Sequence, residues 1–462
     1  MRVVLFLLLF APLFILAQGT AALHKSHHVP VDKKLSQTWK TSLWSDKQKI
    51  YKGDALTTIG MPCGGIAAGQ LVVRGDGTFG DWWIANNAHN TGYGLDTLMS
   101  FNTALGPWKV CYQTFTPMSY IEQGFALKVG ANTYNLSKND FDDISFIGEY
   151  PIAKINYASR KKKLPVQIDM DVFSPFIPLN ARESATPGTV IRYKIKNTSG
   201  KQQEITLTGW LQNMVALELE KKDKLKINRR NRIIKKDGFT SVLMDIENPE
   251  LAKHAYYGNI SLTTLSPNGF GEEDFKSSST AKVGAVGTKV TLKAGEEKEI
   301  VFLLTWYFPN RPAEYEEGMN WTGPIPAAGP AIGNMYSNWY NNSTGVAEWL
   351  SANLDRLTKQ TYKFHDSYYN NTSIPYWLAQ RLMMPVSTLA TETCQWWAND
   401  RFWAWEGVGS CWGVCTHVWN YEQAVAAFFP ELNRNVREKT DLGVSFKEDG
   451  GIDARSGTGG IL

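Results

Sequence analysis

Two spacings of hydrophobic residues divide the chain into a first and a second part. From about residue 50 to residue 310, short runs alternate between apolar and polar side chains and end at turn residues. Such alternation is typical of half-buried antiparallel strands. Residues 191–196 alternate in this way, and after the turn at 197–200 the alternation resumes at 205–208. We interpret these two runs as the strands of one hairpin.

The same arrangement recurs near the end of the first part. Val290 and Leu292 lead through Ala294 and Gly295 to a further alternating run at 300–304, which we interpret as a second hairpin. No helical pattern separates the strands of this part. Many short strands at this spacing predict an antiparallel β-sandwich, and we assign residues 23–334 to this N-terminal domain.

Beyond about residue 335 the hydrophobic spacing lengthens to that of helices. Trp339, Trp349 and Leu354 mark the first predicted helical segment, and further segments continue to about residue 445. Pro430 interrupts an apolar run that has helical spacing. Because proline is tolerated at the first position of a helix, we expect Pro430 to begin the next helix, which continues through Val436.

We divide the second part into a helical linker at residues 335–365 and the start of an all-α domain at 366–462. The last residues, 457–462, form a glycine-rich loop with no closing element after it. The helical pattern before this loop does not complete a closed layer. We therefore expect the chain to be truncated, or its partner helices to come from elsewhere.

The N-terminus has the composition of a secretory signal peptide. Arg2 precedes an apolar run at 3–16, and small residues follow as far as Ala22. This order is typical of export signals. The run is shorter than the roughly 20 apolar residues that span a bilayer, so an uncleaved membrane anchor is the less favoured alternative. We predict that residues 1–22 are removed and that the mature protein is secreted or periplasmic, without integral membrane association.

The charge balance excludes an electrostatic footprint for nucleic acid. The formal net charge is only +4 over 462 residues, whereas nucleic-acid-binding domains are strongly basic. One basic cluster lies at residues 221–236, where isoleucines are interleaved with lysines and arginines. We interpret this cluster as the solvated face of an exposed hairpin.

The cysteines do not indicate a disulfide-dense scaffold or a metal centre. Five are present and they are scattered, and an odd number leaves at least one thiol unpaired within the chain. Cys411, Cys415 and His417 are close together, but no second ligand pair occurs at the spacing of a zinc site. We predict that the protein needs no metal and no organic cofactor.

The stretch from Glu392 to Glu422 holds the residues that are best suited to ligand binding or catalysis. It holds six of the 17 tryptophans of the chain, at positions 396, 397, 403, 405, 412 and 419. Indole combines a large apolar face with one N–H donor, which suits a sugar ring at a pocket rim. We predict that Trp403, Trp405 and Trp412 contact a carbohydrate, and packing in a core is the alternative.

Glycoside hydrolysis usually needs two carboxylates that flank the scissile bond. The candidates in this stretch are Glu392, Asp400, Glu406 and Glu422. Glu406 has the most favourable neighbours, since Gly407 lets a ligand approach the backbone closely. A structural salt bridge is the alternative role for this carboxylate.

Two groups of motifs resemble one known family. Residues 401–408 (Arg-Phe-Trp-Ala-Trp-Glu-Gly-Val), 428–432 (Phe-Phe-Pro-Glu-Leu) and 447–449 (Lys-Glu-Asp) resemble the nucleophile region of the non-lysosomal glucosylceramidase family, glycoside hydrolase family 116. Residues 60–69 (Gly-Met-Pro-Cys-Gly-Gly-Ile-Ala-Ala-Gly), followed by Asp81-Trp82-Trp83, are similar to the glycine-rich opening of that family. The two groups occur in the order found in the family.

The resemblance implies an N-terminal β-sandwich followed by an (α/α)6 barrel that hydrolyses β-glucosides with retention of configuration. By the matching position, Glu406 is the expected nucleophile, and the family's acid/base aspartate lies in a later motif that this chain does not reach. His417 occupies the position of a usual aspartate, and Gly409 that of a common glutamate. A histidine here either carries a proton or hydrogen-bonds a sugar hydroxyl, and a purely structural histidine is the alternative.

These observations predict a retaining β-glycosidase with a carbohydrate or glycoconjugate substrate. The prediction also implies that the chain alone is inactive, because it lacks the second carboxylate. A non-catalytic carbohydrate-binding protein that uses the same aromatic surface is the first alternative. A structural β-sandwich protein without sugar binding is the second.

Overall fold

The computed structural model describes residues 34–44, 47–86, 99–103, 106–110, 121–222, 225–277, 281–312, 331–404, 414–415, 423–452 and 455–456. The chain divides into two compact units, Met1–Asp46 and Lys47–Leu462. In the first unit, helix α2 (Gln37–Ser42) begins after Ser36, whose hydroxyl accepts a hydrogen bond from the backbone N–H of Trp39. The predicted signal peptide, residues 1–22, lies outside the described residues. All elements named below belong to the second unit.

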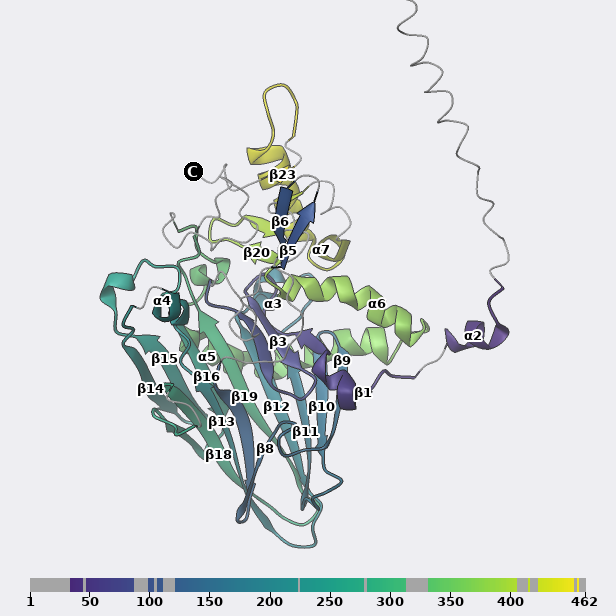
Figure 1. Ribbon diagram of the computed structural model, residues 1–462, viewed down its shortest axis with the longest axis vertical. Helices are drawn as coiled ribbons and strands as arrows, with labels where there is room; N and C mark the ends of the chain where they lie inside the picture. The colour runs from purple at the N-terminus through teal and green to yellow at the C-terminus, as the bar shows by residue number, and fades with distance from the viewer. Residues whose placement is uncertain are drawn as a thin grey trace, which may run out of the picture. The chain divides into compact units, whose positions relative to one another are not determined.

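Two antiparallel sheets form a β-sandwich (Figure 1). In spatial order the nine-stranded sheet contains β1 (Tyr51–Lys52), β9 (Asp143–Glu149), β10 (Ile152–Ala158), β11 (Val166–Phe173), β12 (Gly188–Asn197), β19 (Glu297–Tyr307), β16 (Asn259–Leu265), β15 (Phe239–Ile246) and β14 (Arg229–Lys236). The five-stranded sheet contains β17 (Gly269–Glu272), β18 (Val283–Leu292), β13 (Gln203–Gln212), β7 (Gln123–Val129) and β8 (Asn132–Asn135). The ring of Phe125 on β7 lies 5.1 Å from that of Phe302 on β19 and 5.2 Å from that of Tyr193 on β12. The predicted antiparallel sandwich is therefore confirmed.

Both predicted hairpins are wrong, because each pair of runs belongs to two different sheets. β12 pairs with β11 and β19, whereas β13 pairs with β18 and β7. β18 and β19 are separated in the same way. Buried Asn197 donates from Nδ2 to the carbonyl oxygens of Lys201, Leu292 and Lys293. It therefore connects the loop between β12 and β13 with the loop between β18 and β19. Alternation shows only that one face of a strand is buried, and this is equally true of a strand that lies across the core.

The glycine-rich opening forms a three-stranded sheet of β2 (Gly60–Pro62), β3 (Gln70–Arg74) and β4 (Phe79–Trp83). In the turn after β2, the backbone N–H of Ala67 donates to the carbonyl oxygen of Leu389 at 2.7 Å. A Cβ atom on Gly65 would lie 2.2 Å from the carbonyl oxygen of Thr186. Glycine is therefore required here because two backbones approach each other closely. The opening joins the sandwich to the C-terminal segment.

Smaller pairs of strands complete the described sheets. They are β5 (Met99–Thr103) with β6 (Gly106–Val110), β20 (Cys394–Trp396) with β21 (Phe402–Ala404), and β22 (Val414–Cys415) with β23 (Arg455–Ser456). The short helices beside the sandwich are α3 (Ala181–Ser184), α4 (Leu217–Lys222), η1 (Gly53–Thr57), η2 (Pro249–Leu251), η3 (Met335–Asn338) and η4 (Thr388–Ala390).

Helix α5 (Ser343–Tyr369) covers the outer face of the nine-stranded sheet. Its side chains Val346 and Leu350 pack with Val190 of β12 and Leu303 of β19, all of them buried. The neighbouring strand residues, such as Phe302, face the opposite way into the sandwich. Both faces of the sheet are thus buried. The helix crosses residue 365, where the predicted linker ends.

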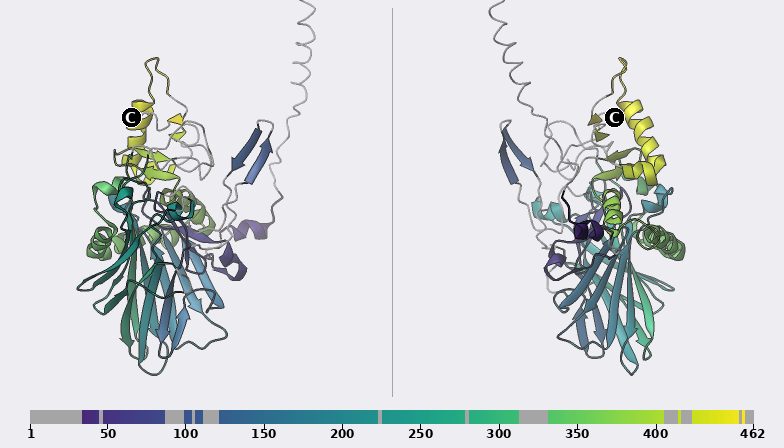
Figure 2. Two further views of the ribbon diagram at one scale, coloured as in Figure 1. Left: turned by 60° about the vertical axis from the view of Figure 1, so that its left-hand side comes forward. Right: turned by 90° about the vertical axis from the view of Figure 1, so that its right-hand side faces the viewer.

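The remaining helices are α6 (Tyr376–Ser387), α7 (Gln423–Phe428) and α8 (Pro430–Asn435), and a π-helical segment η6 (Val436–Val444) continues α8. Pro430 is the first residue of α8, as predicted. The yellow C-terminal helices lie at one end of the strands in every view (Figure 1 and Figure 2). The described helices do not form the expected (α/α)6 barrel, and none of them is long and apolar enough to cross a membrane.

Residues 229–236 of the basic cluster form β14, an edge strand that pairs with β15 in a hairpin. Four of its cations are paired with acidic side chains: Arg229 with Glu220, Arg230 with Asp245 and Glu247, Arg232 with Asp245, and Lys236 with Glu348. Charged side chains on an edge strand prevent pairing with other chains. The interpretation as a solvated hairpin is confirmed.

A buried carboxylate, Glu149 at the end of β9, fastens the helices to the sandwich. It accepts hydrogen bonds from His365 of α5 at 2.8 Å, Tyr376 of α6 at 2.8 Å and Gln48 at 2.6 Å. Lys154 of β10 lies 3.7 Å from the same carboxylate. Burial by itself raises the pKa of Glu149, but the three hydrogen bonds outweigh it and hold the pKa at about 2. The network therefore favours the ionised carboxylate.

We expect Glu149→Gln to lower the free energy of unfolding at pH 7 by about 2–4 kcal/mol, because one partner of a buried charged network is lost. Since the folded-state pKa lies below the ordinary value of 4.5, this stabilisation is present above pH 4.5 and is lost as the pH falls toward 2. Urea unfolding at several pH values measures it. Glu204→Gln, which changes an exposed carboxylate on β13, is the control. An equal effect of the two substitutions at pH 7 would contradict the expectation.

Candidate functional site

The tryptophan-rich stretch is described up to residue 404, and there it forms a hairpin of β20 and β21 rather than a helix. Trp403, which we predicted to contact sugar, lies on β21 with 1% of its surface exposed. Its ring stacks on that of Trp397 at a centroid distance of 5.5 Å. The indole N–H of Trp397 donates to Gln395 Oε1 at 2.9 Å. These contacts fix the base of the hairpin.

Glu392, one of the four candidate carboxylates, is engaged in a buried ion pair with Arg311. Its backbone N–H donates to Gln70 Oε1 at 3.1 Å, which connects it to β3. Burial raises the pKa of Glu392, and Arg311 acts in the opposite direction. A carboxylate neutralised in this way has a structural role, because removing either partner leaves an uncompensated buried charge.

Asp400, a second candidate, caps the turn between β20 and β21. Its backbone is left-handed, with φ of 62°. One carboxylate oxygen accepts the indole N–H of Trp396 at 2.9 Å, and the other pairs with Lys439 of η6. This carboxylate therefore holds the hairpin against the C-terminal helix. The other predicted site residues, Glu406, Trp405, Trp412 and His417, lie outside the described residues, as does Glu422.

Arg401 places a buried cation beside this hairpin. Its guanidinium lies over the Trp397 ring at 5.6 Å, and only 6% of the residue is exposed. Within the described part of the chain, no hydrogen-bond partner reaches its three nitrogen atoms. Burial lowers the pKa of Arg401. An unpaired buried guanidinium favours an anionic group in its surroundings.

Asp81 of β4 is a candidate that sequence reasoning did not single out. Burial raises its pKa to about 7, although Arg74 acts in the opposite direction. Its backbone is left-handed, with φ of 53°. A carboxyl group that titrates near neutral pH is suited to proton transfer. The available signal was a single acidic residue between Gly80 and two tryptophans in an otherwise apolar strand.

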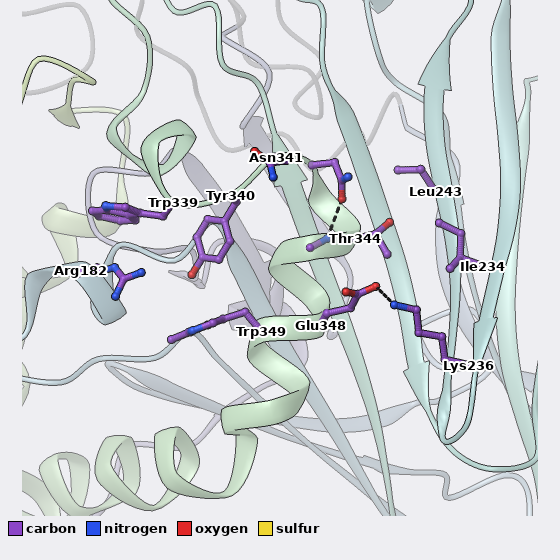
Figure 3. Close-up of a pocket in the computed structure, with 12 residues that line it drawn as sticks. Arg182, Ile234, Lys236, Leu243, Trp339, Tyr340, Asn341, Thr344, Glu348 and Trp349 are labelled. Atoms are coloured by element: carbon purple, nitrogen blue, oxygen red, sulfur yellow. Dashed lines mark hydrogen bonds and ion pairs between the residues drawn. The ribbon is translucent and has the colours of Figure 1, made fainter.

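An aromatic groove of about 500 Å³ opens where α5 begins (Figure 3). Its lining residues come from α3, β14, β15, α5 and the segment before α5: Arg182, Ile234, Lys236, Leu243, Trp339, Tyr340, Asn341, Asn342, Thr344, Gly345, Glu348 and Trp349. The volume is within the range of small-molecule sites. Within the described residues, no three His, Cys, Asp or Glu side chains are grouped so that they could hold a metal ion.

The groove has an aromatic side and an ion-paired side (Figure 3). On the aromatic side, the rings of Tyr340 and Trp349 meet edge to face at 6.1 Å, and the Arg182 guanidinium lies 5.7 Å from the Trp339 ring. On the other side, Lys236 pairs with Glu348 at 2.6 Å.

The groove is also firmly anchored to the sandwich. Asn342 caps α5 by accepting the backbone N–H of Gly345 at 2.7 Å. The hydroxyls of Ser343 and Thr344 lie 2.7 and 3.2 Å from that of Ser261 on β16. Together with the ion pair of Lys236 and Glu348, these contacts fix the start of α5.

Comparisons with known proteins identify the first part of the chain. A family model described as beta-glucosidase 2, glycosyl-hydrolase family 116 N-term, matches residues 60–276. The match begins at the first residue of the glycine-rich opening and confirms that resemblance. It does not extend to Glu406. A search of the curated proteins finds no match.

Solved structures show only distant likeness. A protein described as a kojibiose phosphorylase from the human microbiome matches with a TM-score of 0.35 and 10% identity, over 71% of this chain and 38% of its own. This chain therefore spans little more than a third of that protein. A galactose mutarotase-like protein from Lactobacillus casei matches with a TM-score of 0.26 and 10% identity, over 54% of this chain and 99% of its own. Neither match adds to the functional assignment.

We expect Asp81→Asn to stabilise the protein at pH 8 by about 1–3 kcal/mol. The raised pKa means that the folded state keeps a proton between pH 3.8 and about 7, so stability falls as the pH rises through this window. Asparagine removes the titration and tolerates the left-handed backbone.

Thermal unfolding of the variant and the parent between pH 5 and pH 8 measures this difference. It should shrink toward pH 5, where the parent keeps its proton. Asp237→Asn, at an exposed turn, is the matched control. A difference that does not change with pH would show that Asp81 ionises normally.

Proposed function

We propose that the protein is a retaining β-glycosidase, on the premise that residues 60–276 match the model of the N-terminal domain of glycoside hydrolase family 116. The family match is the observation that carries the proposal. It gives a carbohydrate-active class for the sandwich, and the motif at residues 401–408 resembles the nucleophile region of the same family. The substrate class is β-glucosides or related glycoconjugates.

Glu406 is the proposed nucleophile. In a retaining mechanism its carboxylate attacks the anomeric carbon while the bond to the leaving group breaks, and a covalent glycosyl-enzyme forms. A second carboxyl group, about 5 Å from the first in retaining enzymes, protonates the leaving oxygen and then deprotonates the water that releases the sugar. Trp403, Trp405 and Trp412 are proposed to shape the sugar site, and His417 to hydrogen-bond a hydroxyl. No metal or organic cofactor takes part.

The described hairpin supports this assignment by elimination and by position. Glu392 and Asp400 are both engaged in ion pairs, which leaves Glu406 and Glu422 as the candidates of the original four. The hairpin ends at Ala404, two residues before Glu406. Stacked Trp397 and Trp403 and the ion pair of Asp400 hold the hairpin rigidly, and a catalytic side chain needs such support.

We further propose that the protein is exported, so that it meets glycans in a secreted or periplasmic setting. The N-terminal composition supports this proposal. A non-catalytic carbohydrate-binding protein is the second candidate, because two of the four candidate carboxylates, Glu392 and Asp400, are engaged in ion pairs.

Incubation with 2,4-dinitrophenyl 2-deoxy-2-fluoro-β-glucoside tests the proposed nucleophile. Dinitrophenolate leaves without protonation, so covalent labelling requires the nucleophile alone and does not depend on the acid/base residue. We expect one added fluoroglucosyl group by mass spectrometry, located on Glu406 by peptide mapping. Glu406→Gln should abolish the label and leave the melting temperature unchanged.

Glu422→Gln is the matched control and should label like the parent. Label on Glu392 or Glu422 would remove the assignment of Glu406. Glycan binding without any label would favour the non-catalytic candidate.

A further inference from the structure

We propose that the aromatic groove at the start of α5 is a second carbohydrate site, which binds neutral sugar units of a glycan chain away from the bond that is cleaved. The inference rests on the proposed function for the class of ligand. Its own residues are all described, and none of them belongs to the stretch 392–422. The groove thus adds a preference for extended chains over small glycosides.

The rings of the groove are suited to the apolar face of a pyranose. Trp349 and Tyr340 are only partly buried, and their edge-to-face contact leaves two surfaces at an angle to each other. Aromatic rings give large contact areas with little loss of conformational entropy. In Figure 3 both side chains lie on the same side of the groove as Trp339 and Arg182.

Polar groups around these rings are available to sugar hydroxyls. Among the described residues, the side-chain amide of Asn341 and the indole N–H groups of Trp339 and Trp349 have no hydrogen-bond partner. Arg182 has a cation–π contact with Trp339 but no carboxylate partner in the same set of residues. Three neutral groups and one cation can therefore donate hydrogen bonds to a ligand without breaking an existing one.

Two of the three charged side chains of the groove, Lys236 and Glu348, compensate each other. The third, Arg182, lies over the Trp339 ring and can donate to the hydroxyl oxygens of a neutral sugar. The cap at Asn342 and the hydroxyl contacts with Ser261 fix the start of α5. A site that is already ordered loses little entropy when a ligand binds.

The groove is also continuous with the tryptophan-rich hairpin. Trp339 contacts Trp396 of β20 edge to face, with a centroid distance of 5.4 Å. Trp396 in turn donates to Asp400 at the tip of the hairpin. The groove therefore borders the tryptophan-rich hairpin at Trp396.

Calorimetric titration with a β-1,4-linked glucose tetrasaccharide tests the site. We expect the parent protein to bind it, Trp349→Ala to weaken binding at least tenfold, and Asn341→Ala to weaken it about threefold. Trp377→Ala removes a tryptophan of α6 that is 45% exposed and lies outside the groove, and it should bind like the parent. Because Asn341 is exposed, its variant keeps the test valid if Trp349→Ala does not fold.

The outcomes separate this inference from the proposed function. Unchanged binding in Trp349→Ala and Asn341→Ala, or no binding by the parent, would overturn the groove as a glycan site. The fluoroglucoside has a single sugar unit and does not need the groove. Labelling of Glu406 should therefore be the same in Trp349→Ala and the parent. Loss of the label with intact groove binding would overturn the glycosidase and leave the groove standing.

Discussion

The nine-stranded sheet is apolar on both faces, and this constraint determines what surrounds it. In β19, seven consecutive residues are buried, which a sheet with one solvated face would not show. The five-stranded sheet covers the inner face through contacts such as Phe125 with Phe302. Helix α5 covers the outer face with Val346 and Leu350. The helix brings Glu348 and Trp349 beside the β14–β15 hairpin, so the aromatic groove is a consequence of the same burial.

A second constraint joins the C-terminal segment to the sandwich. Ala67 adopts a left-handed backbone with φ of 52°, which costs roughly 1–2 kcal/mol for a residue with a Cβ atom. The conformation directs its N–H to Leu389 and its carbonyl oxygen to Trp396. Asn86, also left-handed, donates to Ala255 and Phe308. The strained turns around the glycine-rich opening are therefore explained by connections between segments distant in sequence.

The extent to which the sequence predicted the fold depends on the range of each interaction. The sandwich, the solvated basic hairpin and the helix start at Pro430 follow from local periodicity and local backbone chemistry, and all are confirmed. The two predicted hairpins were wrong because a local pattern such as that at 191–208 does not show which strand lies next to it in the sheet. Only the pairing of β12 with β19, about a hundred residues away in sequence, resolves it.

The candidate site was less predictable for the same reason. The sequence gives no sign that Glu392 is ion-paired, because its partner Arg311 is 81 residues away. Asp400 pairs with Lys439 at a separation of 39 residues. The raised pKa of Asp81 likewise comes from burial, which its neighbours in sequence indicate only weakly. Residue type alone therefore did not show the structural roles of Glu392 and Asp400.

The charges around the hairpin are not all paired within the described residues. Arg311 is neutralised by Glu392, and Lys439 by Asp400. Arg401 has no carboxylate partner among the described residues and is buried against Trp397. A retaining nucleophile must be ionised when it attacks, and a nearby cation stabilises that form. Because Glu392 and Asp400 are already engaged, the positive charge of Arg401 favours the ionised form of any further carboxylate beside the turn of the hairpin.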